Sequence, residues 1–300
     1  MSYTFIKEAL ASDRIVLLDG ATGTELQRRG VATKLPLWSS QALIEAPAIV
    51  KQIHEDYVRA GADILTTNTF RTSRHSLDKA GLGHHTERLN HLAVDLARQA
   101  TAGAERPIVV AGSLAPLEDC YAPELVLDED ICRRGHGEQA RILAEAGADF
   151  LLLETFNKLS EGRAALQAAR ATGLPVWMGW VVDQFGNLLS GEPLEEAARV
   201  SEQYGAAVIF LNCRPLATLT PALKRLTSLT RLPVGAYANG AGKPHDDQGW
   251  IFDEKVGVQE YMEHVDRWVR DFGVRIVCGC CGTTPEYIRQ LAAAYQKVPV

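Results

Sequence analysis

The sequence lacks several features that would assign it to a broad functional class. In its 300 residues no apolar run approaches the roughly 20 residues that cross a bilayer, and the N-terminal MSYTFIKEALASDR lacks the apolar core of a secretory signal. The net charge of −6 provides no basic surface for nucleic acid or anionic membranes. The segment DGATGTE has neither the GxGxxG nor the GxxxxGK spacing of a nucleotide-binding loop. We therefore expect a cytoplasmic protein that binds small molecules, and neither nucleic acid nor membrane.

Cysteine is also scarce, but its distribution is uneven. The chain has six cysteines, and three of them lie within four positions of one another in RIVCGCCGTTPEYI. Thiols of a cytoplasmic protein should be reduced, so metal binding or catalysis explains this cluster better than disulfides do. Cys120 and Cys132 have no partner motif nearby, and we interpret both as structural or free thiols.

The rest of the chain alternates short apolar runs with amphipathic segments. Helical spacing of apolar residues is clearest in 42–62 and 137–148, and several such segments end at a glycine just before the next apolar run. Eight strands alternating with helices predict an α/β fold, a single (β/α)8 TIM barrel over 1–300, with an open doubly wound sheet as the alternative. A long polar loop at about 239–261 should lie over the barrel mouth. The predicted strands are 15–20, 64–70, 108–114, 150–156, 176–182, 207–213, 233–239 and 275–281.

Polar residues stand at the end of nearly every apolar run. Active sites of such barrels lie at the carboxyl ends of the strands, so these side chains should converge on one site. The set comprises Asp19, Asn68, Ser113, Glu154, Asn212, Cys213, Tyr237, Asn239, Cys280 and Cys281.

The late cysteines suggest a metal site. Cys213 ends the sixth strand, and Cys280 and Cys281 end the eighth, so their tips can share an ion. Three thiolates suit zinc, with a fourth position open, and paired CxxC motifs of a four-cysteine site are absent. Zinc of this kind removes the proton of an incoming thiol, which fits alkyl transfer to sulfur. Cys278 points to the same face as Cys280, one layer deeper, and could be a small buried hydrophobe. The alternative that all three late cysteines are core residues stays open.

The motifs LLDGATGTELQRRG, HEDYVRAGADILTTNTF, LLLETF, LNC and CGCCGTTPEYI, in this order along nearly the whole chain, resemble the homocysteine S-methyltransferase family. The resemblance implies a homocysteine-binding (β/α)8 barrel with one Zn2+ per chain. It also implies transfer of a methyl group from a cationic donor to the zinc-bound thiolate of L-homocysteine, giving methionine. S-methylmethionine and S-adenosylmethionine are the favoured donors, and betaine serves other members. The family usually reads GGCCG where this chain has CGCCG, so Cys278 adds a thiol without removing a ligand.

The resemblance also implies roles for individual residues. Cys213, Cys280 and Cys281 match the zinc ligands. Glu154 and Asp19 match the carboxylates of the catalytic site that hold the amino group of homocysteine. Further substrate-binding residues are expected at Ala21, Thr22, Asn68, Ser113, Trp180, Asn212, Tyr237 and Asn239.

A sulfonium or quaternary ammonium donor would gain from the faces of aromatic rings. We favour Trp180, nearest the end of the fifth strand, from a set that also includes Trp38, Phe70, Trp177 and Tyr237. Three other functions stay open: methyl transfer to another thiol or to selenocysteine, an acceptor module served by a corrinoid protein, and a zinc or thiol redox sensor. We expect a monomer or a homodimer.

Overall fold

The protein is a closed barrel of parallel strands. This computed structural model describes residues 2–240, 242–245, 249–252 and 257–296. The eight-stranded sheet has the order β1-β10-β7-β6-β5-β4-β3-β2, and a parallel bridge between Leu18 and Ile64 joins the two outer strands. This sequential order confirms the predicted TIM barrel and excludes the doubly wound sheet. The strands are β1 Val16–Leu17, β2 Ile64–Thr66, β3 Val109–Leu114, β4 Phe150–Phe156, β5 Val176–Trp180, β6 Val208–Asn212, β7 Val234–Tyr237 and β10 Ile276–Val277.

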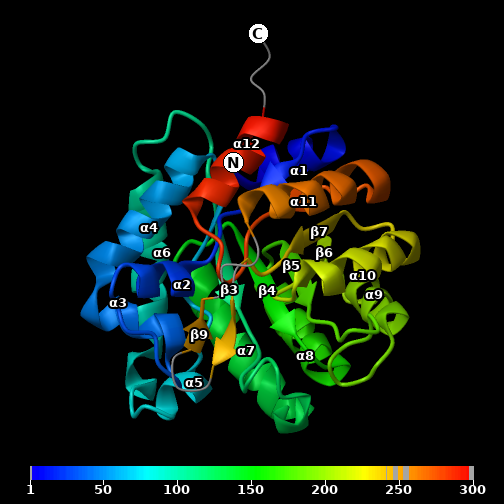
Figure 1. Cartoon of the computed structure of the whole chain (residues 1–300). Coiled ribbons are helices and arrows are strands. Elements are labelled where there is room, and N and C mark those ends of the chain that lie inside the picture. The colour runs from blue at the N-terminus through cyan, green and yellow to red at the C-terminus, as the bar shows by residue number, and fades with distance from the viewer. Residues whose placement is uncertain (1, 241, 246–248, 253–256, 297–300) are drawn as a thin grey trace.

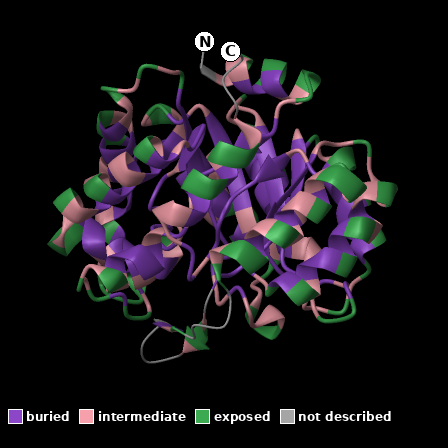
Figure 2. Cartoon of the chain, turned by 45° about the horizontal axis from the view of Figure 1, so that its top comes forward, coloured by how far each residue is buried: buried purple, intermediate pink, exposed green. Residues whose placement is uncertain are grey.

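The strands are mostly apolar because both of their faces are covered. In β4, Phe150 and Leu152 point into the barrel, whereas Leu151 and Leu153 pack against the surrounding helices. This alternation of inner and outer residues is the two-residue period of a strand. Figure 2 shows the result, with buried residues on the central strands and exposed residues on the outer faces of the helices.

A ring of helices surrounds the barrel (Figure 1). Two of the predicted glycine stops are confirmed, since Gly61 and Gly147 follow α4 and α7 with φ of 110° and 96°, a region that favours glycine. Shorter helices at the barrel mouth are α2 Thr22–Arg28, α3 Ala42–Glu45, α5 Arg74–Asp78 and the 3-10 turns η1 Trp38–Gln41, η2 Gly83–His85 and η3 Pro123–Leu125. The ring consists of α4 Pro47–Ala60, α6 Thr86–Thr101, α7 Glu129–Glu145, α8 Leu159–Arg170, α9 Leu194–Gln203, α10 Leu216–Leu229, α11 Val258–Phe272 and α12 Pro285–Tyr295.

Helix α1, Ser2–Ala11, closes the amino end of the barrel. Ile6 and Ala9 are buried among the side chains of the barrel interior. The indole Nε1 of Trp177 donates a hydrogen bond to the hydroxyl of Tyr3 at 2.8 Å. Trp177 therefore lies at the closed end and does not line the mouth of the barrel.

The opposite end carries a small hairpin. Strands β8, Lys243–His245, and β9, Gly249–Ile251, pair antiparallel after β7 (Figure 1). The predicted loop at about 239–261 is shorter, because α11 begins at Val258, and 241, 246–248 and 253–256 lie outside the described residues. None of the helices that the structure describes has the length and apolar character needed to cross a membrane.

Candidate active site

A cavity of about 500 Å³ opens at the carboxyl ends of the strands. Its walls come from β1, β2, β4, β6, β7, the segment after β10 and the hairpin. Of the predicted site residues, Asp19, Ala21, Thr22, Asn68, Glu154, Cys213, Tyr237, Asn239, Cys280 and Cys281 line it.

Glu154, near the end of β4, is held by two hydroxyl groups. The hydroxyl of Tyr237 donates to its Oε2 at 3.2 Å, and the hydroxyl of Ser113 donates to its Oε1. Burial raises the pKa of Glu154 to about 6, although both hydrogen bonds oppose this shift. The carboxylate is thus fixed in orientation, and it forms no salt bridge with any residue that the structure describes.

Asp19 is a second buried carboxylate in the same cavity. Its Oδ2 accepts a hydrogen bond from the backbone amide of Thr66 at 2.8 Å, which ties the end of β1 to β2. Burial raises the pKa of Asp19 to about 8, and the charge of Glu154 adds to this effect. Two buried carboxylates that repel each other favour a bound cation between them.

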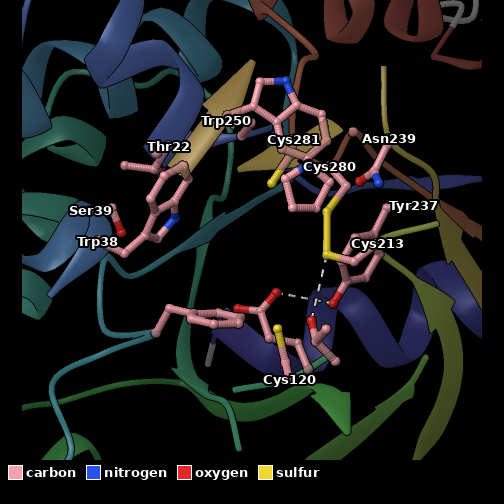
Figure 3. Close-up of a pocket in the computed structure, with 18 of the residues that line it drawn as sticks. Thr22, Trp38, Ser39, Cys120, Cys213, Tyr237, Asn239, Trp250, Cys280 and Cys281 are labelled. Atoms are coloured by element: carbon pink, nitrogen blue, oxygen red, sulfur yellow. Dashed lines mark hydrogen bonds between the residues drawn. A yellow bond between two sulfur atoms is a disulfide. The ribbon is translucent and has the colours of Figure 1, made fainter. Parts of the chain in front are cut away.

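The end of β7 brings the late cysteines together. The amide of Cys213 donates to the carbonyl of Tyr237 at 3.0 Å, and the amide of Cys280 donates to the carbonyl of Ala238 at 2.9 Å. Because β7 lies between β6 and β10, these bonds fix both cysteines at neighbouring positions. Their Cα atoms are 5.7 Å apart, and their sulfurs form a disulfide (Figure 3). Cys281 lines the same cavity as a free thiol.

The disulfide corrects one expectation, since Cys213 and Cys280 are not reduced thiols in this structure. Among the described residues no group of three or more His, Cys, Asp and Glu side chains is arranged to hold a metal ion. The cysteine sulfurs nevertheless suit a zinc ion, both in the chemistry of the donor atoms and in their position around one cavity. After reduction of the disulfide, Cys213, Cys280 and Cys281 would be thiols on the wall of one cavity, which Cys120 and Cys278 also line. Three thiolates are the donor set of an open zinc site.

The backbone around these cysteines is unusual. Thr155 and Cys213 have positive φ values of 65° and 54°, which non-glycine residues rarely adopt outside functional sites. Asn212 supports this geometry: its Nδ2 donates to the Thr155 hydroxyl at 2.7 Å, and its Oδ1 accepts from the Thr155 amide at 3.2 Å. The Thr155 hydroxyl in turn lies 3.5 Å from the sulfur of Cys213. Asn212 is therefore a positioning residue behind the cavity wall.

Comparison with known proteins identifies this arrangement. The model of the homocysteine S-methyltransferase family matches residues 16–295. The chain belongs to this family. It is 31% identical to homocysteine S-methyltransferase of Escherichia coli, covering 96% of this chain and 97% of that protein. It is 27% identical to a selenocysteine Se-methyltransferase of Brassica oleracea, covering 92% and 87%. The metallated form of the E. coli homocysteine methyltransferase MmuM superposes with a TM-score of 0.83 at 29% identity, covering 96% and 99%.

Besides Asn212, two other predicted positions of this homocysteine S-methyltransferase family member lie away from the cavity surface. Ser113 is fully buried and acts through Glu154. Trp180 is also fully buried, but on the outer side of β5, where its Nε1 donates to the hydroxyl of Ser201 on α9 at 2.9 Å. The choice of Trp180 as a donor-binding ring is wrong, because the strand alternation that turns Trp177 inward turns Trp180 towards the helices.

Aromatic side chains from loops line the cavity instead. Trp38 of η1 lies across the cavity from Cys213 and Tyr237 in Figure 3, and Trp250 comes from β9. Asn68 donates to the carbonyl of Ser39 at 2.9 Å, which anchors η1 to the end of β2. The lining also includes Phe70 and Tyr121.

Several cavity residues lack a signal in the sequence. Cys120, interpreted above as structural or free, lines the cavity, and burial raises the pKa of its thiol to about 12. Arg71 and Arg214 line it as well. Cys278 is buried behind Cys280 as expected, with its thiol directed to the carbonyl of Ala236 at 3.8 Å. Loop residues such as Cys120 follow no strand, so strand-end reasoning misses them.

Proposed function

We propose that this protein transfers a methyl group from a cationic donor to the sulfur of L-homocysteine, giving methionine. One observation carries the proposal: a pair of buried carboxylates and the sulfurs of Cys213, Cys280 and Cys281 line one cavity. Family membership supports the same reaction.

The carboxylates suit the amino end of the acceptor. Glu154 and Asp19 both have raised pKa values because burial penalises their charge, and an ammonium group between them would relieve that penalty. The buried Oδ1 of Asn239 has no hydrogen-bond partner among the described residues and can accept another proton of this ammonium. Ala21 and Thr22 border the same pocket, and we assign them to the acceptor as well.

Cys213, Cys280 and Cys281 would hold one zinc ion after reduction of the disulfide. When bound there, zinc lowers the pKa of a coordinated thiol, so that a sulfur nucleophile is available at neutral pH. The E. coli relative MmuM has a metallated form, and this similarity supports a metal in the present chain. The need for reduced thiols supports a cytoplasmic location.

The remainder of the cavity suits the donor. Trp38, Phe70 and Trp250 offer ring faces to a sulfonium or quaternary ammonium group, and we favour S-methylmethionine or S-adenosylmethionine. The acceptor sulfur forms a bond to the methyl carbon as the bond from that carbon to the donor sulfur breaks. The donor sulfur keeps the electron pair, and the proton of the acceptor thiol passes to solvent. Holding both substrates in one cavity converts this displacement into a positioned step.

Two other functions have an observation in their favour. The selenocysteine Se-methyltransferase relative supports a selenol as acceptor. The disulfide between Cys213 and Cys280 supports a redox-sensing role. The turnover experiment below also tests a corrinoid partner. The choice between a monomer and a homodimer is tested separately, by the mass of the protein in solution.

The proposal is tested by methionine formation from L-homocysteine with reduced, zinc-loaded protein. S-methylmethionine, S-adenosylmethionine and betaine serve as parallel donors, and selenocysteine serves as a second acceptor. We expect turnover with homocysteine that disappears in Cys213→Ser. No turnover with any free donor, followed by turnover with a methylcorrinoid protein, would replace this proposal by the corrinoid alternative. Loss of zinc on mild oxidation without any turnover would favour the redox sensor.

A further inference from the structure

The cavity contains two arginines that the reaction described above does not use. Arg71 follows β2 and is only 8% exposed, and Arg214, which is half-buried, directly follows Cys213. Buried guanidinium groups are uncommon without an anionic partner. Among the described residues neither arginine forms a salt bridge, and the buried Nε of Arg214 has no hydrogen-bond partner.

The loop after β3 joins the two arginines into one region. Arg71 donates to the carbonyl of Glu118 at 2.7 Å, at the start of this loop. The hydroxyl of Tyr121, at its other end, donates to the carbonyl of Cys213 at 3.2 Å, beside Arg214. The carboxylate of Asp119, on the same loop, accepts the amide of Tyr121 at 2.8 Å. No salt bridge joins Asp119 to either guanidinium group among the residues that the structure describes.

From these contacts we propose that Arg71 and Arg214 bind the carboxylate of a zwitterionic methyl donor. The inference rests on the proposed function and specifies its second substrate. A donor that has a cationic methyl-bearing centre but no carboxylate would not fit this subsite.

The position of the arginines separates this subsite from the acceptor. Arg71 donates to the loop after β3, and Arg214 adjoins the contact of Cys213 with the same loop. Glu154 is held instead by the hydroxyls of Ser113 and Tyr237. The ammonium and carboxylate of one α-amino acid share a carbon atom, so an acceptor held by Glu154 places its own carboxylate near Glu154. We therefore assign the arginines to the second substrate.

The neighbouring ring completes a site for a zwitterion. The guanidinium of Arg71 lies 5.5 Å from the centre of the Phe70 ring, and both side chains line the cavity. A donor can thus place its carboxylate on the guanidinium groups and its cationic sulfur near aromatic faces. Sulfonium amino acids such as S-methylmethionine carry both charges.

Binding of two matched ligands tests the inference without depending on turnover. Calorimetric titration of reduced, zinc-loaded protein, without homocysteine, compares S-methyl-L-methionine with its α-carboxamide. A charge-assisted interaction is worth roughly tenfold to a hundredfold in Kd, so the carboxamide should bind weaker by that factor. In Arg214→Gln and Arg71→Gln the two ligands should bind within about threefold of each other. Arg231→Gln removes the same charge from the exposed turn before β7 and should keep the wild-type ratio.

The ratio is measured within each variant, so a partly unfolded variant does not distort it. Equal affinities of the two ligands for wild-type protein, or no binding of either, would overturn the inference. It would also fail if Arg214→Gln weakened binding of homocysteine and left the donor ratio intact, because the arginines would then serve the acceptor. Absence of methionine formation would refute the proposed function. The ratio of the two Kd values would still decide whether the arginines bind a carboxylate, because it does not depend on turnover.

Discussion

Removing the hydroxyl of Tyr237 tests how the cavity tunes Glu154. Tyr237→Phe deletes one of the two hydrogen bonds that lower the pKa of Glu154 from the value that burial alone would give. A hydrogen bond to a charged group contributes about 1.5–3 kcal/mol, and one pKa unit corresponds to about 1.4 kcal/mol. The bond is long at 3.2 Å, so the lower end applies, and the pKa should rise from about 6 by about one unit.

The assay is the pH dependence of kcat/KM for homocysteine at saturating donor, which reports groups of the enzyme without bound acceptor. Below its pKa, Glu154 is neutral and cannot pair with the ammonium, so activity rises with pH. The break of the acidic limb near pH 6 should move to higher pH in the variant, whereas the break that Asp19 sets near pH 8 should stay. Tyr295→Phe is a matched control, because that hydroxyl also contacts a carboxylate, Asp266, at 3.2 Å, but outside the cavity. An acidic limb that stays in place in Tyr237→Phe, or moves equally in both variants, would refute the assignment of Glu154 to the ammonium.

Three further predictions concern the metal, the second carboxylate and the donor rings. Cys281→Ser should lose zinc, measured by atomic absorption, and at least about 100-fold in turnover, whereas Cys132→Ser, outside the cavity, should keep both. Burial keeps Asp19 protonated in the folded state up to about pH 8, so wild type loses stability as the pH rises from 4 to 8. Asp19→Asn lacks this ionisation. Its free energy of unfolding relative to wild type, measured in urea, should therefore increase by more than about 1 kcal/mol over that range. The variant should also lose homocysteine binding, and an unchanged stability difference across that range would contradict the raised pKa. Trp38→Leu should raise the KM of the donor about threefold to thirtyfold, while Trp180→Phe should lower only the Tm; the reverse pattern would contradict the placement of the rings.

The barrel could be predicted because its signals are local. Apolar runs covered on both faces and helices that stop at glycines such as Gly61 give the strand count, and the count gives the architecture. Residues at strand ends, such as Glu154 and Cys213, followed from that architecture. The ends themselves were less predictable, since β1 and β10 are two residues long where runs of six or seven were expected.

Residues that act from loops or from behind the wall could not be predicted. Trp180 was misplaced because its side of the strand depends on register, which the continuous apolar run of β5 does not reveal. Trp250 and Arg71 reach the cavity through a hairpin and a loop whose paths depend on tertiary contacts. Asn212 stands at a strand end as expected, but its side chain turns back to support Thr155.

The central claim is that this cavity brings the sulfur of homocysteine to a donor methyl group. Its most direct test is to incubate reduced, zinc-loaded protein with homocysteine labelled with carbon-13 in its carbon chain and S-methylmethionine deuterated in the sulfonium methyl groups. Methionine that carries both labels is followed by mass spectrometry, because the donor that loses one methyl group is also methionine. The account predicts labelled methyl on the carbon skeleton of homocysteine in wild type and none in Cys213→Ser. Labelled methionine formed equally by both proteins, or homocysteine recovered without label from a zinc-loaded enzyme, would contradict it.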